Sequence, residues 1–128
     1  AIASDTAAEL YGLVIVERNI EDEPDNTTRF LVIGTQAALP SDDDKTSLLI
    51  SVRNRPGALY RMLRPLADHG ISMTRIESRP SRQAMWEYVF YIDVDGHRDD
   101  PAVTAALGAL EQEAFAVRVL GSYPKSVV

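Results

Sequence analysis

The chain has 128 residues, 45% of them hydrophobic and 25% charged, which is typical of a soluble globular protein and by length alone predicts one domain. Thirteen basic and nineteen acidic residues give a formal net charge of -6. Binding through phosphate groups is therefore disfavoured, and we expect neither nucleic acid nor a membrane as a partner. Cysteine is absent, which excludes disulfides and thiol chemistry, and no apolar run is long enough to span a bilayer.

The sequence begins with neither an initiator methionine nor the basic start of a secretion signal, so we interpret it as a piece of a longer protein. Residues 1–11 are rich in alanine and precede Gly12, which predicts a helix with a glycine C-cap. The apolar runs 13–16 and 30–33 predict two strands, and their unbroken apolar character predicts cover on both faces. One helix and two such strands cannot fold alone, so we assign residues 1–34 to a remnant of a larger α/β domain.

The remaining residues divide into a linker and a second domain. Residues 35–44 contain a proline and three successive aspartates, a composition that predicts a linker. From residue 45 onward, alternation of apolar and polar residues predicts four strands, over residues 46–53, 71–79, 86–94 and 115–119. Apolar residues spaced by three and four predict two helices, over residues 57–69 and 100–110.

The order of these elements predicts the fold of residues 45–128. The succession βαββαβ is that of α+β domains of the ferredoxin-like class, which have an antiparallel sheet with both helices on one face. In a regular strand, alternate side chains point to the same face, so Ile71 and Met73 would share one face and Ile76 would point to the other. This mismatch predicts a bulge in the second strand. Pro65 is expected to kink the first helix. The open sheet face should bear aromatic residues, so we expect self-association.

The first candidate site is the segment Asn54-Arg55-Pro56-Gly57-Ala58-Leu59, between the first strand and the first helix. Asn54 could cap the helix or bend the chain, Pro56 presets a helical φ, and Gly57 lets another group approach the backbone. Free N–H groups there, aided by the helix dipole, would suit a carboxylate. An ordinary capped turn explains the same residues, and the residues alone favour it.

The second candidate site is Glu77-Ser78-Arg79-Pro80, at the end of the second strand. Strand alternation places Glu77 and Arg79 on one face and Ser78 on the other. An acid, a hydroxyl and a guanidinium together fit a zwitterionic amino acid. The alternative is a solvated strand end with a surface ion pair that contributes little, and the residues alone favour this alternative.

A third candidate site is Thr28-Arg29-Phe30, at the start of the run 30–33. A threonine can donate a hydrogen bond to a leaving oxygen, and an arginine can pair with a carboxylate. The alternative is an ordinary strand start. His69 and His97 have no second ligand at metal-binding spacing, so we interpret both as structural and expect no metal.

These three motifs occur in an order that resembles prephenate dehydratases. Thr28-Arg29-Phe30 resembles the TRF motif of their catalytic domain, and Gly57-Ala58-Leu59-Tyr60 and Glu77-Ser78-Arg79-Pro80 resemble the GALV and ESRP motifs of their regulatory ACT domain. Tyr60 replaces the family valine. The resemblance implies a C-terminal remnant of the catalytic domain over residues 1–34, a linker over 35–44 and an ACT domain over 45–128.

The resemblance also implies a function. The parent would be a cytoplasmic enzyme, in many bacteria with a chorismate mutase domain, that converts prephenate to phenylpyruvate without a cofactor, with Thr28 as the catalytic residue and Arg29 and Phe30 shaping the site. The ACT domain would bind L-phenylalanine between two copies of a homodimer or homotetramer and inhibit the enzyme. The implied effector-binding residues are Asn54, Pro56, Gly57, Ala58, Leu59, Glu77, Ser78, Arg79 and Pro80.

Other functions are compatible with parts of the pattern. Residues 1–34 cannot enclose a substrate pocket, so we expect the chain itself to be inactive. A nucleic-acid-binding domain can share the βαββαβ plan, but the net charge and the lack of lysine and arginine in residues 86–94 oppose it. A domain that only dimerises stays open as an alternative.

Overall fold

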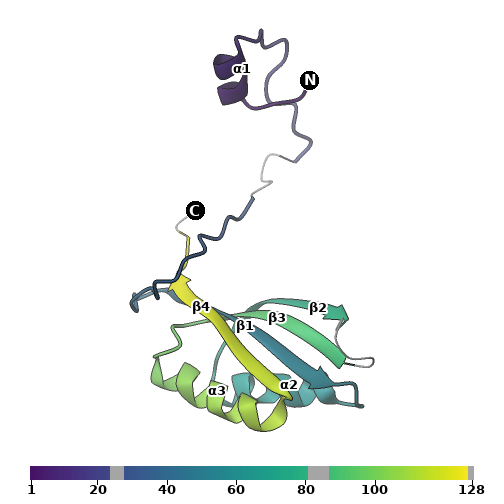
Figure 1. The fold of residues 1–128 in the computed structure, drawn as a ribbon, viewed down its shortest axis with the longest axis vertical. Coiled ribbons are helices and arrows are strands. Elements are labelled where there is room, and N and C mark those ends of the chain that lie inside the picture. Colours follow the sequence, from purple (N-terminus) through teal and green to yellow (C-terminus); the bar gives the residue numbers. More distant parts are fainter. Residues whose placement is uncertain (24–27, 81–86, 127–128) are drawn as a thin grey trace. The chain divides into compact units, whose positions relative to one another are not determined.

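The computed structural model describes residues 1–23, 28–80 and 87–126. Two compact units are present, residues 1–33 and residues 34–128 (Figure 1). No helix in the described part of the chain is long and apolar enough to cross a membrane.

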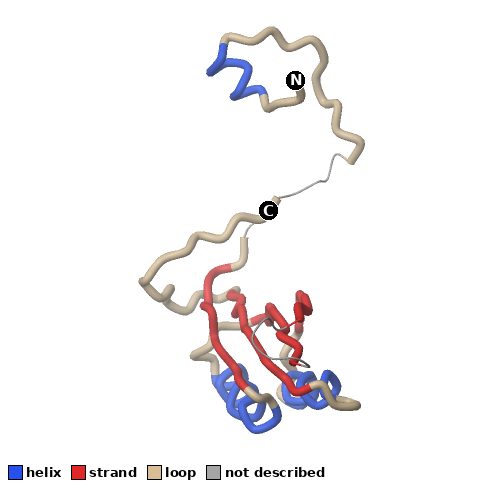
Figure 2. Tube along the Cα trace, turned by 45° about the vertical axis from the view of Figure 1, so that its right-hand side comes forward, coloured by secondary structure: helices blue, strands red, loops and turns tan. Residues whose placement is uncertain are grey.

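The second unit is built from four strands and two helices. In chain order these are β1 (Asp44–Arg53), α2 (Ala58–Asp68), β2 (Met73–Pro80), β3 (Glu87–Asp95), α3 (Pro101–Glu113) and β4 (Ala116–Pro124). All neighbouring strands are antiparallel, in the order β2-β3-β1-β4. Figure 2 shows the two helices together on one side of the strands. The prediction of an α+β ferredoxin-like domain is therefore confirmed.

The hydrophobic core lies between the sheet and the two helices. Alternate residues of β1 are buried, and Leu48 and Ile50 are 0% exposed. Leu48 pairs with Ile92 of β3 and with Val119 of β4, so one inward-facing row crosses three strands. The helices complete the core with Met62 and Leu66 of α2 and Ala106 and Leu110 of α3. Burial of this apolar surface is the main force that holds the unit together.

The second strand contains the predicted bulge. Met73 pairs with Val94 and Arg75 pairs with Asp93, so Thr74 is an extra residue on β2. Its hydroxyl donates a hydrogen bond to the Asp93 carbonyl (3.3 Å). Because of this residue, both Met73 and the later residues of β2 keep the faces that their partners on β3 require. The described part of β3 begins at Glu87; Trp86, the predicted first residue of that strand, lies outside the described residues.

The ends of α2 and α3 were predicted from glycine and proline. Gly70 has a left-handed φ of 67, the N–H of Ile71 donates to the Leu66 carbonyl (2.8 Å) and the N–H of Gly70 donates to the Ala67 carbonyl (3.0 Å). These two bonds form a Schellman motif, so Gly70 ends α2 as expected. α2 continues through Pro65 to Asp68.

α3 begins as predicted, with Pro101 as its first residue and Asp100 in the N-cap position. The Asp100 side chain accepts a hydrogen bond from the N–H of His97 (2.8 Å) rather than from the helix. The cap residue therefore fixes the preceding turn.

The first unit contains one short helix, α1 (Asp5–Tyr11). The Ser4 hydroxyl accepts a hydrogen bond from the N–H of Ala7 (3.2 Å), and Gly12 is the left-handed C-cap, as predicted. The predicted strands over residues 13–16 and 30–33 are wrong. Both runs are irregular, and Val14 and Val32 are 88% and 102% exposed.

The reason for this difference is the lack of partners within the unit. A continuous apolar strand needs hydrogen-bonding neighbours and cover on both faces. The described residues of the unit offer only α1, a helix of 7 residues with no buried residue. The apolar pattern is therefore present without the sheet that it requires.

Polar contacts hold the segment before β1 against the rest of the second unit. The N–H of Asp99 donates to His97 Nδ1 (3.2 Å), so Nε2 carries the proton and donates to the Ala38 carbonyl (3.3 Å). Lys125 pairs through Nζ with Asp43 (2.6 Å), and its N–H donates to the Asp43 carbonyl (2.9 Å). His97 is 2% exposed, so its interpretation as a structural residue agrees with its surroundings.

Asp44 is a buried acid at the start of β1, and its titration should affect stability. Burial raises the pKa of its carboxyl, but hydrogen bonds from the hydroxyl and the N–H of Ser41, with the positive charge of Lys125, more than offset this effect. The pKa therefore lies below its ordinary value of 3.8. A lowered native-state pKa contributes stability that is fully present above the unfolded-state pKa and is lost as the pH falls through the native value.

We therefore expect the melting temperature to fall more steeply below pH 3.8 for the natural sequence than for Asp44→Asn. Thermal melts between pH 2 and pH 7, monitored by circular dichroism, would measure both slopes. Asp42→Asn, at an exposed neighbouring position, serves as the control and should leave the slope unchanged. Equal acid slopes for the natural sequence and Asp44→Asn would refute this account.

Candidate functional site

A pocket of about 270 Å³ lies where the turn between β1 and α2 meets the ends of β2 and β3. Its lining residues are Val52, Arg53, Asn54, Arg55, Gly57, Ala58, Leu59, Ser78, Tyr88 and Phe90. Five of the predicted effector-binding residues lie together in it: Asn54, Gly57, Ala58, Leu59 and Ser78. Pro56 lies in the turn and is exposed, and Pro80 is the last residue of β2.

The backbone at the start of α2 is held in a conformation that glycine favours. Gly57 is the N-cap residue, with φ 75 and ψ 9 in the left-handed region. No described side chain caps the helix, so Asn54 bends the chain rather than capping α2. The N–H of Ala58 donates to the Arg55 carbonyl (3.0 Å), and the N–H of Arg61 donates to the Gly57 carbonyl (3.0 Å).

The next two N–H groups of α2 are available to a ligand. The first N–H groups of a helix have no intrahelical acceptor. For Leu59 and Tyr60, the described part of the chain supplies no other acceptor either. These two N–H groups and the positive end of the helix dipole suit a carboxylate.

The strand β2 divides the second predicted motif between the two faces of the sheet. Ser78 pairs with Phe90, so its side chain faces the helices and the pocket. Glu77 pairs with Tyr91 and Arg79 pairs with Val89, which places both on the open face. Among the motif residues whose side chains the structure describes, one copy of the chain therefore brings only Ser78 into the pocket.

Glu77 and Arg79 form an ion pair on the open face. Arg79 Nη2 lies 2.8 Å from Glu77 Oε1, and Arg75 Nη2 lies 2.6 Å from Glu77 Oε2. The hydrogen bond from Arg79, with the charges of Arg79 and Arg75, lowers the pKa of Glu77. The Arg79 guanidinium also lies 5.8 Å from the centre of the Tyr91 ring. The arrangement keeps an acid ionised between two cations at the sheet edge.

Five pocket residues were absent from the predicted effector-binding set: Val52, Arg53, Arg55, Tyr88 and Phe90. The rings of Tyr88 and Phe90 are stacked, with centroids 6.3 Å apart, and form an apolar wall. Strand alternation could have identified both rings, because they share the face of Ser78. No carboxylate lines the pocket among the described residues. The chemistry therefore favours a ligand with a carboxylate and an apolar body.

The third predicted motif lies in the first unit. Thr28, Arg29 and Phe30 are in an irregular, exposed segment, and Phe30 is 86% exposed. Their predicted place at the start of a strand is wrong, for the reason given above.

Comparison with known proteins identifies both parts of the chain. Residues 46–112 match the family model of the ACT domain, and residues 1–38 match that of prephenate dehydratase. A bifunctional chorismate mutase/prephenate dehydratase of Stutzerimonas stutzeri is 54% identical over 128 residues, which is 100% of this chain and 35% of that protein. The chain thus spans about a third of that relative.

Solved structures agree with this result. Prephenate dehydratase from Staphylococcus aureus superimposes with a TM-score of 0.77 at 31% identity, over 91% of this chain and 44% of that one. The enzyme from Arthrobacter aurescens, solved in complex with L-Phe, gives 0.66 at 38% identity, over 72% and 30% of the two chains. The resemblance seen in the short motifs is therefore confirmed. The chain belongs to the ACT domain family and corresponds to the C-terminal, ACT-containing part of prephenate dehydratases.

Proposed function

We propose that this chain is the phenylalanine-sensing, feedback-inhibitory region of a prephenate dehydratase. The observation that carries the proposal is the pocket at the β1–α2 turn, where free helix N–H groups lie beside an apolar, aromatic wall. A relative with 38% identity was solved in complex with L-Phe. A free amino acid is therefore the ligand class that fits both the chemistry and the relationship.

The parts of L-phenylalanine match distinct parts of the pocket. Its carboxylate would accept hydrogen bonds from the N–H groups of Leu59 and Tyr60, with Arg55 adding positive charge. Its ammonium would donate to the side-chain oxygens of Asn54 or Ser78. Its ring would pack on the aromatic wall and on Val52, where burial of apolar area adds affinity.

A second copy of the chain would complete the site. The open sheet face leaves Tyr91 39% exposed, and Glu77 and Arg79 lie on that face. We propose a homodimer or homotetramer through the ACT domains, in which the Glu77-to-Pro80 strand end closes a pocket from across the interface. The alternative is that the domain only dimerises, without an effector.

The catalytic role belongs to the longer parent protein. There, Thr28 would hydrogen-bond the departing hydroxyl of prephenate, with Arg29 and Phe30 shaping the site. Stabilising the leaving oxygen lets decarboxylation drive aromatisation to phenylpyruvate. We expect no prephenate turnover from this chain alone, because residues 1–33 are too few to enclose a substrate pocket.

We expect L-phenylalanine to raise the melting temperature of the chain, and L-alanine to leave it unchanged. At 100 times Kd the ligand should add about 2.7 kcal/mol of stability. Ser78→Ala should weaken the response, because it removes one hydrogen-bonding group from the pocket. Thermal shift with calorimetric titration would measure both effects, and size-exclusion chromatography with light scattering would establish the oligomeric state.

Ser72→Ala is the matched control, since Ser72 is exposed between α2 and β2 and does not line the pocket. A dimer that shows no response to millimolar L-phenylalanine would refute the sensing proposal and favour the dimerisation-only alternative. Equal responses to L-alanine and L-phenylalanine would show that the aromatic wall does not bind the ring of L-phenylalanine.

A further inference from the structure

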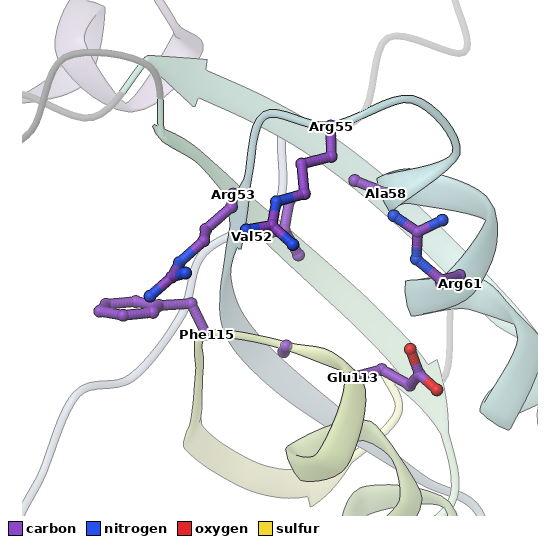
Figure 3. Close-up of a pocket in the computed structure, with 8 residues that line it drawn as sticks. Val52, Arg53, Arg55, Ala58, Arg61, Glu113 and Phe115 are labelled. Carbon is purple, nitrogen blue, oxygen red and sulfur yellow. The ribbon is translucent and has the colours of Figure 1, made fainter.

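A second hollow, of about 390 Å³, lies on the other side of the β1–α2 turn, next to the end of α3. Its lining residues are Val52, Arg53, Arg55, Ala58, Arg61, Glu113, Ala114 and Phe115. Figure 3 shows Arg53, Arg55 and Arg61 around it, with Phe115 next to Arg53 and Glu113 on the side of Arg61. Among the predicted effector-binding residues whose side chains the structure describes, Ala58 alone lines this hollow.

The charge of this hollow is opposite to that of the chain. The whole sequence carries a net charge of -6, yet three arginines and a single acid line the hollow. In the described part of the chain, no carboxylate lies within ion-pairing distance of Arg53, Arg55 or Arg61. Unpaired cations that share one concave surface repel one another, and an anion would remove that repulsion.

The helix dipole does not explain the arginines. The positive end of α2 favours acids in its first turn, but that turn contains no acid, and Arg55 and Arg61 lie on either side of its start. Likewise, Glu113 is the last residue of α3, where a cation would be favoured, and the last turn has no basic residue. Both helix ends at the hollow therefore carry the charge that their own dipoles disfavour.

One arginine is held in place by an aromatic ring. The Arg53 guanidinium carbon lies 5.4 Å from the centre of the Phe115 ring, a cation–π distance. Phe115 is 58% exposed, so the pair forms a rim of the hollow rather than part of the core. A guanidinium that is already oriented loses less conformational freedom when it binds a ligand.

We propose that this hollow binds a small multivalent oxyanion through Arg53, Arg55 and Arg61. Guanidinium groups bind carboxylate and phosphate groups in two-point geometry, and three of them around one hollow suit a ligand with several such oxygens. The site adjoins the amino-acid pocket, and four residues line both: Val52, Arg53, Arg55 and Ala58. The proposal does not depend on binding of L-phenylalanine.

The test is a titration of the full 128-residue chain with citrate and with inorganic phosphate, at ionic strength held constant with sodium chloride. We expect saturable NMR shifts of the backbone amides over residues 53–61 and 113–115. The double variant Arg55→Gln/Arg61→Gln should weaken binding by about tenfold or more, since it removes two of the three cations. A response to citrate alone or to phosphate alone supports the site and identifies the carboxylate or the phosphate as its ligand group.

The control is Arg98→Gln/Arg118→Gln, which removes the same charge at exposed positions outside the hollow. This variant should bind with unchanged affinity. NMR shifts that rise linearly with the concentration of both anions, without saturating, would overturn the proposal. An equal loss of affinity in the two double variants would also overturn it, because both results indicate general charge screening rather than a binding site. L-phenylalanine titrations of the same variants are read separately, so failure of one site does not imply failure of the other.

Discussion

Gly57→Val is expected to weaken L-phenylalanine binding by about tenfold or more, which corresponds to about 1.4 kcal/mol. Gly57 has a φ of 75, and a β-branched residue in this region costs of the order of 1 to 3 kcal/mol. A Cβ at this position would lie 3.2 Å from Arg61 Nη1, the flexible end of a side chain, so the strain lies in the backbone. The turn should rearrange and move the N–H groups of Leu59 and Tyr60. Calorimetric titration would measure the loss.

Gly70→Val provides a matched control for that experiment. Gly70 also has a positive φ, of 67, and a Cβ there would meet no atom within 4 Å. Both variants should therefore lose comparable stability. Only Gly57→Val should lose affinity, because Gly70 lies at the far end of α2. If the two variants bind L-phenylalanine equally well, the ligand does not bind at the β1–α2 turn.

Leu48→Ala is expected to lower the free energy of unfolding by about 2 to 5 kcal/mol. Leu48 is 0% exposed and lies in one of the two central strands of the sheet, where it pairs with Ile92 and Val119. Removing its side chain leaves a cavity beneath both helices. Because small domains have a total stability of about 5 to 15 kcal/mol, this single change removes a large part of it. Urea unfolding followed by circular dichroism would measure the change.

Leu49→Ala tests the assignment of the faces. Leu49 is the next residue on β1, half-buried, and its partner Tyr91 lies on the open face. Its truncation should cost about 1 kcal/mol at low protein concentration. An equal cost for the two variants at every concentration would contradict the burial pattern of β1. A cost for Leu49→Ala that grows with concentration would instead show that a second copy covers this face.

The fold of residues 44–126 could be predicted because local signals and tertiary packing agree there. The residues of β1 alternate between buried and half-buried along the strand, up to the exposed Arg53 at its end. Gly70 and Pro101 lie at helix ends, as their backbone preferences require. The bulge at Thr74 was visible as a change of parity between Met73 and Ile76. A second irregularity, where Leu120 is the extra residue between Val119 and Gly121, has no such signal.

The site was only partly predictable. The turn around Gly57 could be found because a glycine beside a proline marks unusual backbone. Leu59 lies in the first turn of α2 and is 43% exposed, at the pocket. The positions of Ser78 and Glu77 on opposite faces of the sheet could be predicted, because successive side chains of a strand alternate between the two faces. The convergence of Arg53 and Phe115 depends on the pairing of β1 with β4 and could not be read from sequence spacing.

The errors in the first unit have a different origin. The apolar runs 13–16 and 30–33 carry a correct strand pattern, but a pattern becomes a strand only where other strands accept its hydrogen bonds. Among the described residues of that unit, α1 is the one regular element. Sequence periodicity indicates that a segment is suited to form a strand. It does not show whether other strands are present to pair with it.

The pairing of β1 with β4 also determines how the second unit must fold. Asp44 pairs with Pro124, so one edge of β1, the first strand of the unit, is paired by β4, the last strand. Its other neighbour, β3, is also distant in sequence, and no tight hairpin nucleates the centre of the sheet. Contacts between distant segments slow folding, because the chain must close large loops before they form. During synthesis, β1 therefore emerges with an unpaired edge and stays exposed to chaperones and to other nascent chains until the C-terminal strand has been made.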